Sequence, residues 1–330
     1  PCKQGDSMIK VALDALGGDY APDVVIDGAV RAVQEAAGEL HVVLCGPQEV
    51  VKQGLEKLGY SGDAISIVDA PEPVAMDEHP VEVLRKKPNS GLVTCVALQK
   101  KGLVQASVSA GNSGAMMASC LMLLGRTSEN FARPPIGCIL PTAKGQMVMV
   151  DAGANVDEKA PVLVDFAKAG SVFAECYLGV ENPRVALLNM GEEEKKGPAV
   201  IQEAYQLLKN VEAINFIGNI EGREVLLGGA DVLVCSGYTG NVVLKMIEGF
   251  YILHNELFGK IDTPAGRRFD ETWDYRNAGG ALLLGLNGTG LIAHGISDAL
   301  AIKQACLAAC RFAKNGVAQK IGEKLSGMNQ

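Results

Sequence analysis

Short runs of β-branched and other apolar residues alternate along this chain with longer segments in which apolar positions recur at helical spacing. The short runs predict nine strands, at Ile9–Leu13, Val42–Cys45, Ile65–Val68, Ala106–Ser109, Ile136–Leu140, Met147–Val150, Arg184–Leu188, Ala213–Ile217 and Asp231–Cys235. The longer segments predict helices at Pro22–Ala37, Gln48–Leu58, Ser90–Gly102, Gly114–Leu124, Pro161–Tyr177, Pro198–Lys209, Asn241–Phe258 and His294–Lys314. Apolar strands that alternate with helices predict an α/β fold, with a mainly parallel sheet in an αβα sandwich.

Two parts of the chain depart from this alternation. The segment Gly259–Gly280 is polar and turn-rich and carries the only Trp, so we expect an insertion near residues 255–280 that forms a surface hairpin or a dimer arm. Pro1–Ser7 is expected to be an extension ahead of a natural start at Met8. The length of 330 residues fits one two-lobed domain or two close ones, and we expect a single two-lobed catalytic domain over residues 8–330.

Small residues accompanied by Asn, Ser or Asp follow six of the nine predicted strands. In an open α/β sheet, ligands bind outside the carboxyl ends of the strands, where helix N-termini offer free N–H groups to anions. Glycine-rich loops are common after strands, so the prediction depends on the six occurring together. The extended nucleotide-binding motifs are absent, which indicates a small anion. The loop residues expected to contact it are Asp14, Gly17, Gly18, Ser109, Gly111, Asn112, Ser113, Asn155, Asn189, Asn219 and Gly240.

Three further side chains are candidates for the same edge of the sheet. Lys196 follows three consecutive glutamates just beyond a predicted strand, which indicates either a solvated helix start or a cation that reaches a phosphate or an oxyanion. Lys245 lies one helical turn after Asn241 and has the same two interpretations. His294 follows a glycine-rich loop and is expected to open the last helix, facing either the site or the helix surface.

Composition narrows the class of protein and its compartment. The chain has 30 basic and 38 acidic residues, a formal net charge of −8, which argues against nucleic-acid binding. Its nine cysteines are scattered without a C-x-x-C motif, so neither a disulfide nor a zinc site is expected and the protein is predicted to be cytoplasmic. The longest apolar run, Ala115–Gly125, is about half of the ~20 residues that a membrane-spanning helix needs.

Taken together, the glycine- and asparagine-containing segments resemble the bacterial phosphate acyltransferase family, which makes acyl phosphate from acyl carrier protein thioesters. They run in the family's order over essentially the whole chain. Departures are Leu16, Ser113 and Ser236-Gly237-Tyr238, where the family usually has Met, Thr and Asp-Gly-Phe. The matching segments are Asp14–Pro22, Val108–Ala115, Asp151–Asn155, Leu187–Glu194 with Lys196-Gly197, Asn215–Gly222, Gly237–Lys245, Gly279–Leu286 and His294-Gly295.

The resemblance implies a fold like that of isocitrate and isopropylmalate dehydrogenases and of phosphotransacetylase, in a homodimer. It implies that acyl carrier protein and inorganic phosphate are the substrates, that no metal or organic cofactor takes part, and that a downstream glycerol-3-phosphate acyltransferase uses the product. The resemblance implies that Lys196 and Asn241 are the catalytic residues. Asn241 would donate to the developing oxyanion, and Lys196 would either bind phosphate or itself attack the thioester.

The resemblance also implies a docking surface for an acidic carrier protein. The densest basic clusters are Arg85-Lys86-Lys87 and Arg267-Arg268, and either cluster is equally well explained as a solvated helix end. The helix within Ala115–Gly125 is expected either to line an acyl groove or to be buried. Because the product is a lipid, peripheral contact with the inner face of the cell membrane is a further expectation, for which Phe250–Leu253 would supply apolar contacts.

Three other functions remain open from the sequence. One is a metal- and NAD-dependent hydroxyacid dehydrogenase, although its cluster of Asp ligands cannot be assembled from Asp151, Asp157 and Asp231. The second is a phosphotransacetylase that uses acyl-CoA, and the third is a non-catalytic, membrane-associated scaffold for lipid enzymes. The scaffold predicts that replacing Lys196 leaves cellular function intact.

Overall fold

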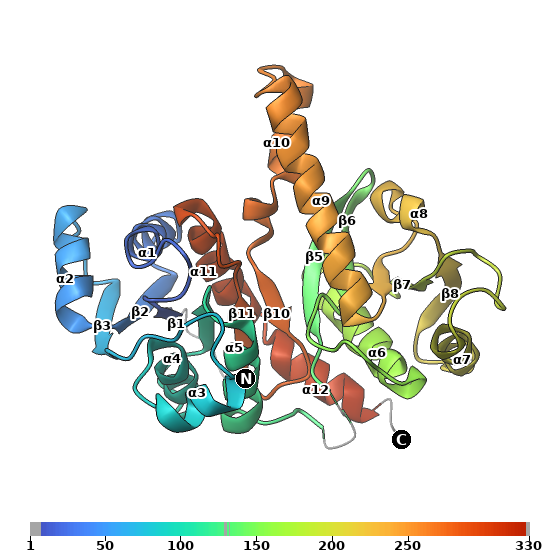
Figure 1. Cartoon of the computed structure of the whole chain (residues 1–330), viewed down its shortest axis with the longest axis horizontal. Helices are drawn as coiled ribbons and strands as arrows, with labels where there is room; N and C mark the ends of the chain where they lie inside the picture. Colours follow the sequence, from blue (N-terminus) through green and yellow to red (C-terminus); the bar gives the residue numbers. More distant parts are fainter. Residues whose placement is uncertain (1–7, 129–130, 132, 328–330) are drawn as a thin grey trace, which may run out of the picture. The chain divides into compact units, whose positions relative to one another are not determined.

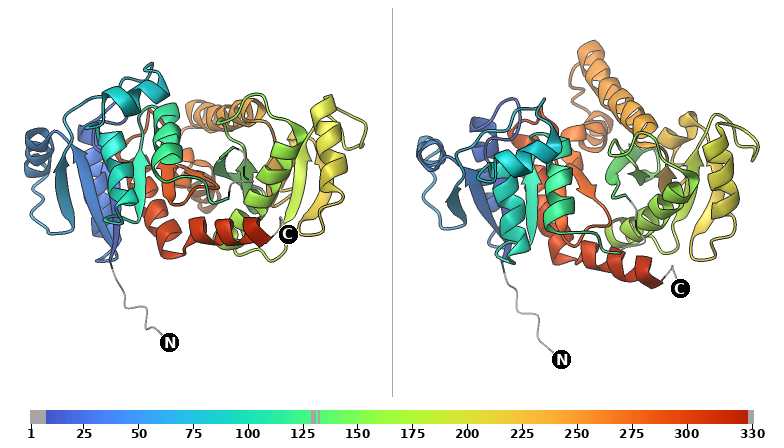
Figure 2. Two further views of the ribbon diagram at one scale, coloured as in Figure 1. Left: turned by 90° about the horizontal axis from the view of Figure 1, so that it is seen from below. Right: turned by 60° about the horizontal axis from the view of Figure 1, so that its bottom comes forward.

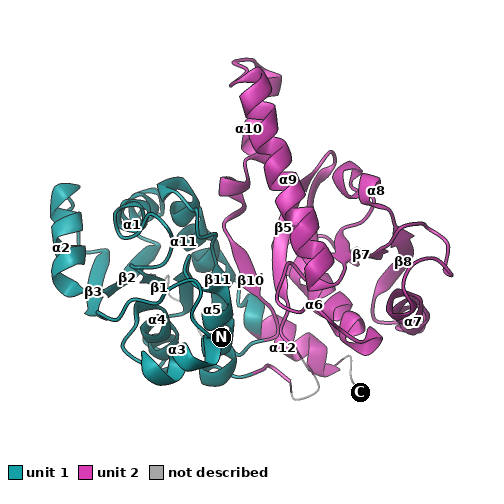
Figure 3. Ribbon diagram, in the orientation of Figure 1, with its two compact units in different colours: residues 1–125, 286–318 teal, residues 126–285, 319–330 magenta. Residues whose placement is uncertain are grey.

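The computed structural model describes residues 8–128, 131 and 133–327, and the chain divides into two compact units (Figure 3). Unit 1 comprises residues 1–125 and 286–318, and unit 2 comprises residues 126–285 and 319–330. The expected extension Pro1–Ser7 lies outside the described residues. Both units are built from a sheet flanked by helices, so the predicted α/β class is confirmed.

The strands of unit 1 are all parallel. Their order is β3-β2-β1-β4-β11, with β1 at Ile9–Asp14, β2 at Leu40–Gly46, β3 at Ile65–Asp69, β4 at Ala106–Ser109 and β11 at Thr289–Ile292. The helices are α1 (Asp23–Glu35), α2 (Gln48–Lys57), α3 (Pro80–Lys86), α4 (Gly91–Lys100), α5 (Ser113–Leu123) and α11 (Ala299–Lys314). Because β1 and β4 are central strands covered by helices, the last four residues of β1 and all of β4 are buried.

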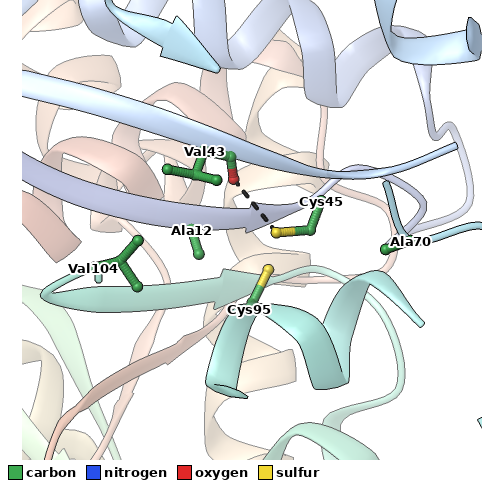
Figure 4. Close-up of a cluster of buried hydrophobic side chains, with 6 residues drawn as sticks. All are labelled: Ala12, Val43, Cys45, Ala70, Cys95 and Val104. Atoms are coloured by element: carbon green, nitrogen blue, oxygen red, sulfur yellow. Dashed lines mark hydrogen bonds between the residues drawn. The ribbon is translucent and has the colours of Figure 1, made fainter. Parts of the chain in front are cut away.

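The core of unit 1 is formed where these helices meet the strands. Helices α1 and α11 pack against each other, and Gly28 permits the close approach because a Cβ there would stand 2.6 Å from the Cβ of Ile302. Helix α4 packs on β1, β2 and β4 (Figure 2). Figure 4 shows a cluster between α4 and the strands that includes the thiols of Cys45 and Cys95, with Ala12, Val43, Ala70 and Val104.

Unit 2 has a mixed sheet in the order β10-β5-β6-β9-β7-β8 (Figure 1). The β10–β5 and β5–β6 pairs are antiparallel, and β6, β9, β7 and β8 run parallel to one another. The strands are β5 (Ile136–Thr142), β6 (Gly145–Val150), β7 (Arg184–Leu188), β8 (Asn215–Ile220), β9 (Val232–Val234) and β10 (Ala281–Leu283). The helices are α6 (Ala160–Leu178), α7 (Ala199–Leu208), α8 (Gly222–Leu227), α9 (Gly237–Phe258), α10 (Pro264–Trp273), a 3-10 turn at Tyr275–Ala278, and α12 (Val317–Gly327), most of which belongs to this unit.

The nine predicted strands are all present, and several boundaries differ for local reasons. Gly218-Asn219, predicted as a loop, belongs to β8. Helix α9 begins at Gly237 because the Ser236 hydroxyl caps it by accepting from the amide of Thr239. Helix α11 begins at Ala299 behind the cap Asp298, so His294 lies in the preceding loop and does not open a helix.

The insertion Gly259–Gly280, whose sequence is polar and turn-rich, is largely helical. Thr263 caps α10, with its hydroxyl accepting from the amide of Gly266, and Pro264 occupies the first turn. Rings of α10 pack on rings of α9: Phe269 lies 4.2 Å from His254 and 6.2 Å from Tyr251, measured between centroids. The two helices thus form a hairpin that extends from unit 2 (Figure 1).

Candidate active site

In unit 1, three loops that carry predicted site residues follow neighbouring parallel strands. Asp14 ends β1, Asn112 follows β4, and His294 follows β11. Because β1, β4 and β11 are adjacent and parallel, their carboxyl ends lie at one edge of the sheet. The structure therefore brings these parts of the prediction together within unit 1.

The side chain of Asn112 shapes the loop that enters α5. Its Oδ1 accepts from the amide of Ala115 at 2.9 Å, which caps the helix. Its Nδ2 donates to the carbonyls of Ala75 (3.3 Å), Met76 (3.1 Å) and Glu78 (2.9 Å). Since the amide group is occupied by the protein, what α5 offers to an anion is the main chain of its first turn, where Ser113 is exposed.

A buried carboxyl group lies beneath this loop. The Ser109 hydroxyl donates to Asp14 Oδ2 at 2.7 Å and accepts from the amide of Gly111 at 3.0 Å, while the amide of Leu16 donates to Asp14 Oδ1 at 3.3 Å. Asp14 is 5 % exposed, and desolvation raises its pKa to about 6 against the opposing hydrogen bonds. Gly17 covers the pair: a Cβ there would stand 2.8 Å from Asp14 Oδ2.

The loop after β11 contacts the loop after β1. The amide of Asp19 donates to the carbonyl of Gly295 at 2.7 Å, and Gly18, at φ +108°, would place a Cβ 3.1 Å from the same carbonyl oxygen. Gly18 therefore serves a close main-chain approach. His294 is half-buried in this loop, and its carbonyl accepts from the amide of Ser297 at 2.9 Å.

In unit 2, the loops with predicted residues follow the adjacent parallel strands β6, β9, β7 and β8. Their carboxyl ends form one edge, from which Asn155, Asn241 and Lys196 follow β6, β9 and β7 respectively, while Asn219 lies near the end of β8. The two residues that the resemblance makes catalytic therefore belong to the same unit and the same edge.

Asp151, which was considered only as a metal ligand, organises the loop after β6. Its carboxylate accepts from the amides of Ile136, Gly153, Ala154 and Asn155 and from the Asn155 side chain, at 2.7 to 3.2 Å. Burial raises the pKa of Asp151, and these five donors act against that shift. Asn155 Nδ2 also donates to Pro134 O at 3.3 Å, so its amide is used within the loop. An Asp directly after the apolar run Met147–Val150 is the signal that could have identified this residue.

The first turn of α9 packs directly on this loop. A Cβ at Gly240 would collide with the carbonyl oxygen of Asp151, so Gly240 is required for packing. The amide of Gly237 donates to Glu158 Oε1 at 3.1 Å, which places a carboxylate of the protein at the N-terminus of α9. Asn241 is exposed, and it lies beside Gly153. Lys245 forms an ion pair with Glu248 at 2.8 Å.

Lys196 lies on a turn that side-chain amides hold in place. Asn189 Nδ2 donates to Lys196 O at 3.0 Å, and Asn189 Oδ1 accepts from the amide of Met190 at 2.9 Å. Asn219 Nδ2 donates to the carbonyl of Glu193 at 3.1 Å. Asn189 and Asn219 thus hold the turn, whereas the Lys196 side chain is exposed.

The basic clusters considered for docking are partly paired within the protein. Lys86 pairs with Glu82 at 2.9 Å, Lys87 pairs with Glu78 at 2.5 Å, and Arg267 pairs with Asp262. Arg85 and Arg268 are exposed. Within residues 8–128, 131 and 133–327, no group of three or more His, Cys, Asp or Glu side chains is arranged to hold a metal ion. No helix in this described part of the chain is both long and apolar enough to cross a membrane.

Solved structures share the fold at low sequence identity. A phosphotransacetylase from Streptococcus pyogenes matches with a TM-score of 0.65 and 20 % identity, over 93 % of this chain and 94 % of that chain. A 4-hydroxythreonine-4-phosphate dehydrogenase from Klebsiella pneumoniae matches with a TM-score of 0.52 and 16 % identity, over 93 % of this chain and 98 % of that chain. The expected similarity of fold to phosphotransacetylases and dehydrogenases is confirmed.

Relatives in sequence have a much higher identity to this chain than these solved structures have. The family model described as "Fatty acid synthesis protein" matches residues 9–320. A phosphate acyltransferase from Desulforamulus reducens is 46 % identical over 96 % of this chain and 98 % of its own length. One from Dictyoglomus turgidum is 42 % identical over 98 % of both chains. The chain therefore belongs to the fatty acid synthesis protein family, together with the bacterial phosphate acyltransferases.

Proposed function

We propose that this enzyme transfers a long-chain acyl group from acyl carrier protein to inorganic phosphate, giving acyl phosphate for phospholipid synthesis. The observation that carries the proposal is the match, over nearly the whole chain, to phosphate acyltransferases. Family membership makes the chain a phosphate acyltransferase. The carrier-bound donor is the part that the proposal adds.

In the proposed reaction, a phosphate oxygen attacks the thioester carbonyl carbon. The C–O bond forms, the C–S bond breaks, and the sulfur leaves as the carrier's thiol after taking up a proton. Asn241 donates from its side-chain amide to the carbonyl oxygen as negative charge develops there, and one such donor is typically worth ~3 kcal/mol in the barrier. The exposed Lys196 ammonium binds phosphate and offsets its charge.

Direct attack by phosphate is the route we favour over an acyl-lysine intermediate. An amide formed on Lys196 is less reactive than the acyl phosphate that would have to follow. Intact mass measured under denaturing conditions, after incubation with acyl carrier protein thioester but without phosphate, separates the two routes. A stoichiometric acyl adduct on Lys196 would refute direct attack.

In unit 1, the first turn of α5 binds a phosphate group of a substrate. Its first-turn main-chain amides and the helix dipole favour an anion there. The glycine-rich loops after β1 and β4 approach closely enough to frame this turn, because Gly17 and Gly111 carry no Cβ. His294 lies on the third loop at the same edge of the sheet.

The central test is phosphate-dependent release of carrier thiol from palmitoyl acyl carrier protein. Lys196→Ala should lower kcat about a hundredfold or more, as expected for loss of a charged group that contacts the reacting phosphate. Lys195→Ala is the matched control, because Lys195 is an exposed neighbour on the same turn. Equal rates for the wild type and Lys196→Ala would overturn the assignment of Lys196. Absence of thiol release by the wild type would overturn the proposed function.

A phosphotransacetylase-like reaction with acyl-CoA is the second candidate, favoured by the shared fold. Comparing kcat/KM for acetyl-CoA with kcat/KM for acyl carrier protein that carries a long-chain acyl group separates the two candidates. A higher kcat/KM for acetyl-CoA would select the second.

We propose that the protein is a homodimer in which the α9–α10 hairpin is the arm. An apolar stripe along α9 supports this, because its members recur at helical spacing and are exposed: Tyr238, Val242, Met246, Phe250, Leu253 and Leu257. Light scattering of the wild type and of Met246→Glu tests the proposal. A monomeric wild type that floats with anionic vesicles would assign the stripe to a membrane instead.

A further inference from the structure

We propose that Asp14 is a positioning residue whose carboxylate, acting through Ser109, holds the two glycine-rich loops of unit 1 in the arrangement that presents the first turn of α5 to a phosphate group. That the ligand at α5 is a phosphate group rests on the proposed function. The positioning role rests on the hydrogen bonds and close approaches around Asp14.

Burial argues against direct contact between Asp14 and an anion. Asp14 is 5 % exposed and Ser109 is 1 % exposed. Each carboxylate oxygen already has a donor from the protein, Ser109 Oγ on Oδ2 and the amide of Leu16 on Oδ1. A carboxylate would also repel a phosphate. Asp14 therefore acts on the ligand only through the loops above it.

The connection from Asp14 to α5 is short. Ser109 donates to Asp14 at 2.7 Å and accepts from the amide of Gly111 at 3.0 Å, and Asn112, the next residue, caps α5. From the other loop, Gly17 approaches so closely that a Cβ would stand 2.8 Å from both Asp14 Oδ2 and the amide nitrogen of Gly111. The Asp14–Ser109 pair is therefore the point at which the two loops meet.

Protonation of Asp14 changes this hydrogen bond. The ionised carboxylate accepts from the Ser109 hydroxyl in a charge-assisted bond, which is stronger than a neutral one. A protonated carboxyl group can itself donate to Ser109 Oγ, and the bond then loses its charge assistance. Two buried thiols lie on the same side of the strands: Cys45, the register partner of Asp14 on β2, and Cys95 on α4 (Figure 4). Burial, with smaller contributions from Cys45 and the Asp14 charge, raises the pKa of Cys95 well above its usual range.

Asp151 at the end of β6 is a second buried carboxyl group whose pKa is raised by burial, and it has more donors than Asp14. Five N–H groups donate to the Asp151 carboxylate and stabilise its charge. Asp14 has one hydroxyl and one amide donor, so burial is less well opposed and its pKa is about 6.

The test is the pH dependence of kcat/KM for the wild type, Asp14→Asn and Ser109→Ala, measured separately for inorganic phosphate and for palmitoyl acyl carrier protein. The ratio of wild type to Asp14→Asn cancels ionisations common to both enzymes, including that of phosphate itself. This ratio should fall about tenfold between about pH 7 and pH 5, for the substrate whose phosphate group α5 binds. Ser109→Ala removes the hydroxyl through which Asp14 acts, so it should flatten the transition in kcat/KM. The carboxyl titration of Asp14 itself should move to higher pH in Ser109→Ala, because a donor to the ionised form is lost. Asp63→Asn, an exposed carboxylate in the same unit, should leave the profile unchanged.

A ratio that is flat with pH for both substrates would overturn the proposal. A carboxyl 13C titration of the wild type and Ser109→Ala needs no acyl donor, so it remains decisive if Asp14→Asn fails to fold or if thiol release is absent. A midpoint for Asp14 below about pH 4.5, or one unchanged in Ser109→Ala, would also overturn it. Failure of thiol release alone counts against the proposed function only.

Discussion

The side-chain amide of Asn189 donates to the main-chain carbonyl of Lys196 across 3.0 Å, which closes a turn whose first amide, that of Met190, donates back to Asn189 Oδ1. One side chain therefore joins the two ends of the turn. The same turn is fastened by Asn219 to the carbonyl of Glu193 and by Gln202 to the carbonyl of Gly197. The lysine proposed to bind phosphate is thus held through its own main chain.

Replacing Asn189 by Ala should lower activity more than stability. The loss of its hydrogen bonds frees the main chain of Lys196 but empties little of the core, so we expect a loss of about 1 kcal/mol in the free energy of unfolding. We expect a fall of tenfold or more in kcat from misplacement of the ammonium group. Urea unfolding and thiol-release kinetics measure the two effects. Asn210→Ala, which removes a single exposed contact to Gln206 O, is the control.

Two glycines of α9 should respond oppositely to Ala. At Gly240 the new methyl group would collide with Asp151 O, so Gly240→Ala should lower the free energy of unfolding by about 1–3 kcal/mol or more. Gly249 is helical, and beyond its chain neighbours and the backbone of its own helix nothing lies within 4 Å of the added Cβ. Gly249→Ala should therefore raise the free energy of unfolding by up to about 1 kcal/mol. Chemical denaturation of both variants checks this. Equal effects at the two positions would contradict the packing described for α9.

The ionisation of Asp14 should also make the free energy of unfolding depend on pH. Its folded pKa of about 6 exceeds the ordinary value of 3.8, so between these values the folded state binds more protons than the unfolded state. The free energy of unfolding contributed by Asp14 therefore falls as pH rises from about 4 to 6, by about 3 kcal/mol at most, and is level above that.

Comparison with Asp14→Asn isolates this contribution, because other carboxyl groups titrate alike in both proteins. The free energy of unfolding of the variant, minus that of the wild type, should increase from pH 4.5 to pH 7. A constant difference over that range would show that Asp14 titrates normally.

The aromatic contacts between α9 and α10 should depend on Phe269. Its ring lies 4.2 Å from His254 and 5.9 Å from Trp273, measured between centroids. Phe269→Ala should loosen α10 and shift the emission of Trp273, the only tryptophan of the chain, to longer wavelength. Leu227→Ala, at an exposed position on α8 outside the hairpin, should leave the emission unchanged. An unshifted spectrum in both variants would mean that the rings do not hold the hairpin together.

The fold could be predicted wherever a segment is buried on both faces. The ranges predicted for β4 and β7, Ala106–Ser109 and Arg184–Leu188, agree with the structure at both ends, because a loop that contains glycine and asparagine follows each short strand directly. Helix α10 was missed because its apolar face consists of Phe269 and Trp273, whose partners lie on α9. The start of α11 was missed because the cap Asp298 is a single residue inside an irregular loop.

By itself the sequence determined the order of nine strands and eight helices, the glycine and asparagine residues that follow the strands, and, through similarity, the family. It missed the strands β10 and β11 and the helices α3, α8, α10 and α12. The sequence could not show which asparagine side chains bond to the protein's own main chain and which are exposed. In the structure the side-chain amides of Asn112, Asn155, Asn189 and Asn219 donate to main-chain carbonyls of the protein, whereas Asn241 is exposed. Only the tertiary structure decided this division, because the partner of a side-chain amide is supplied by whichever segment folds against it, as Ala75 to Glu78 do for Asn112.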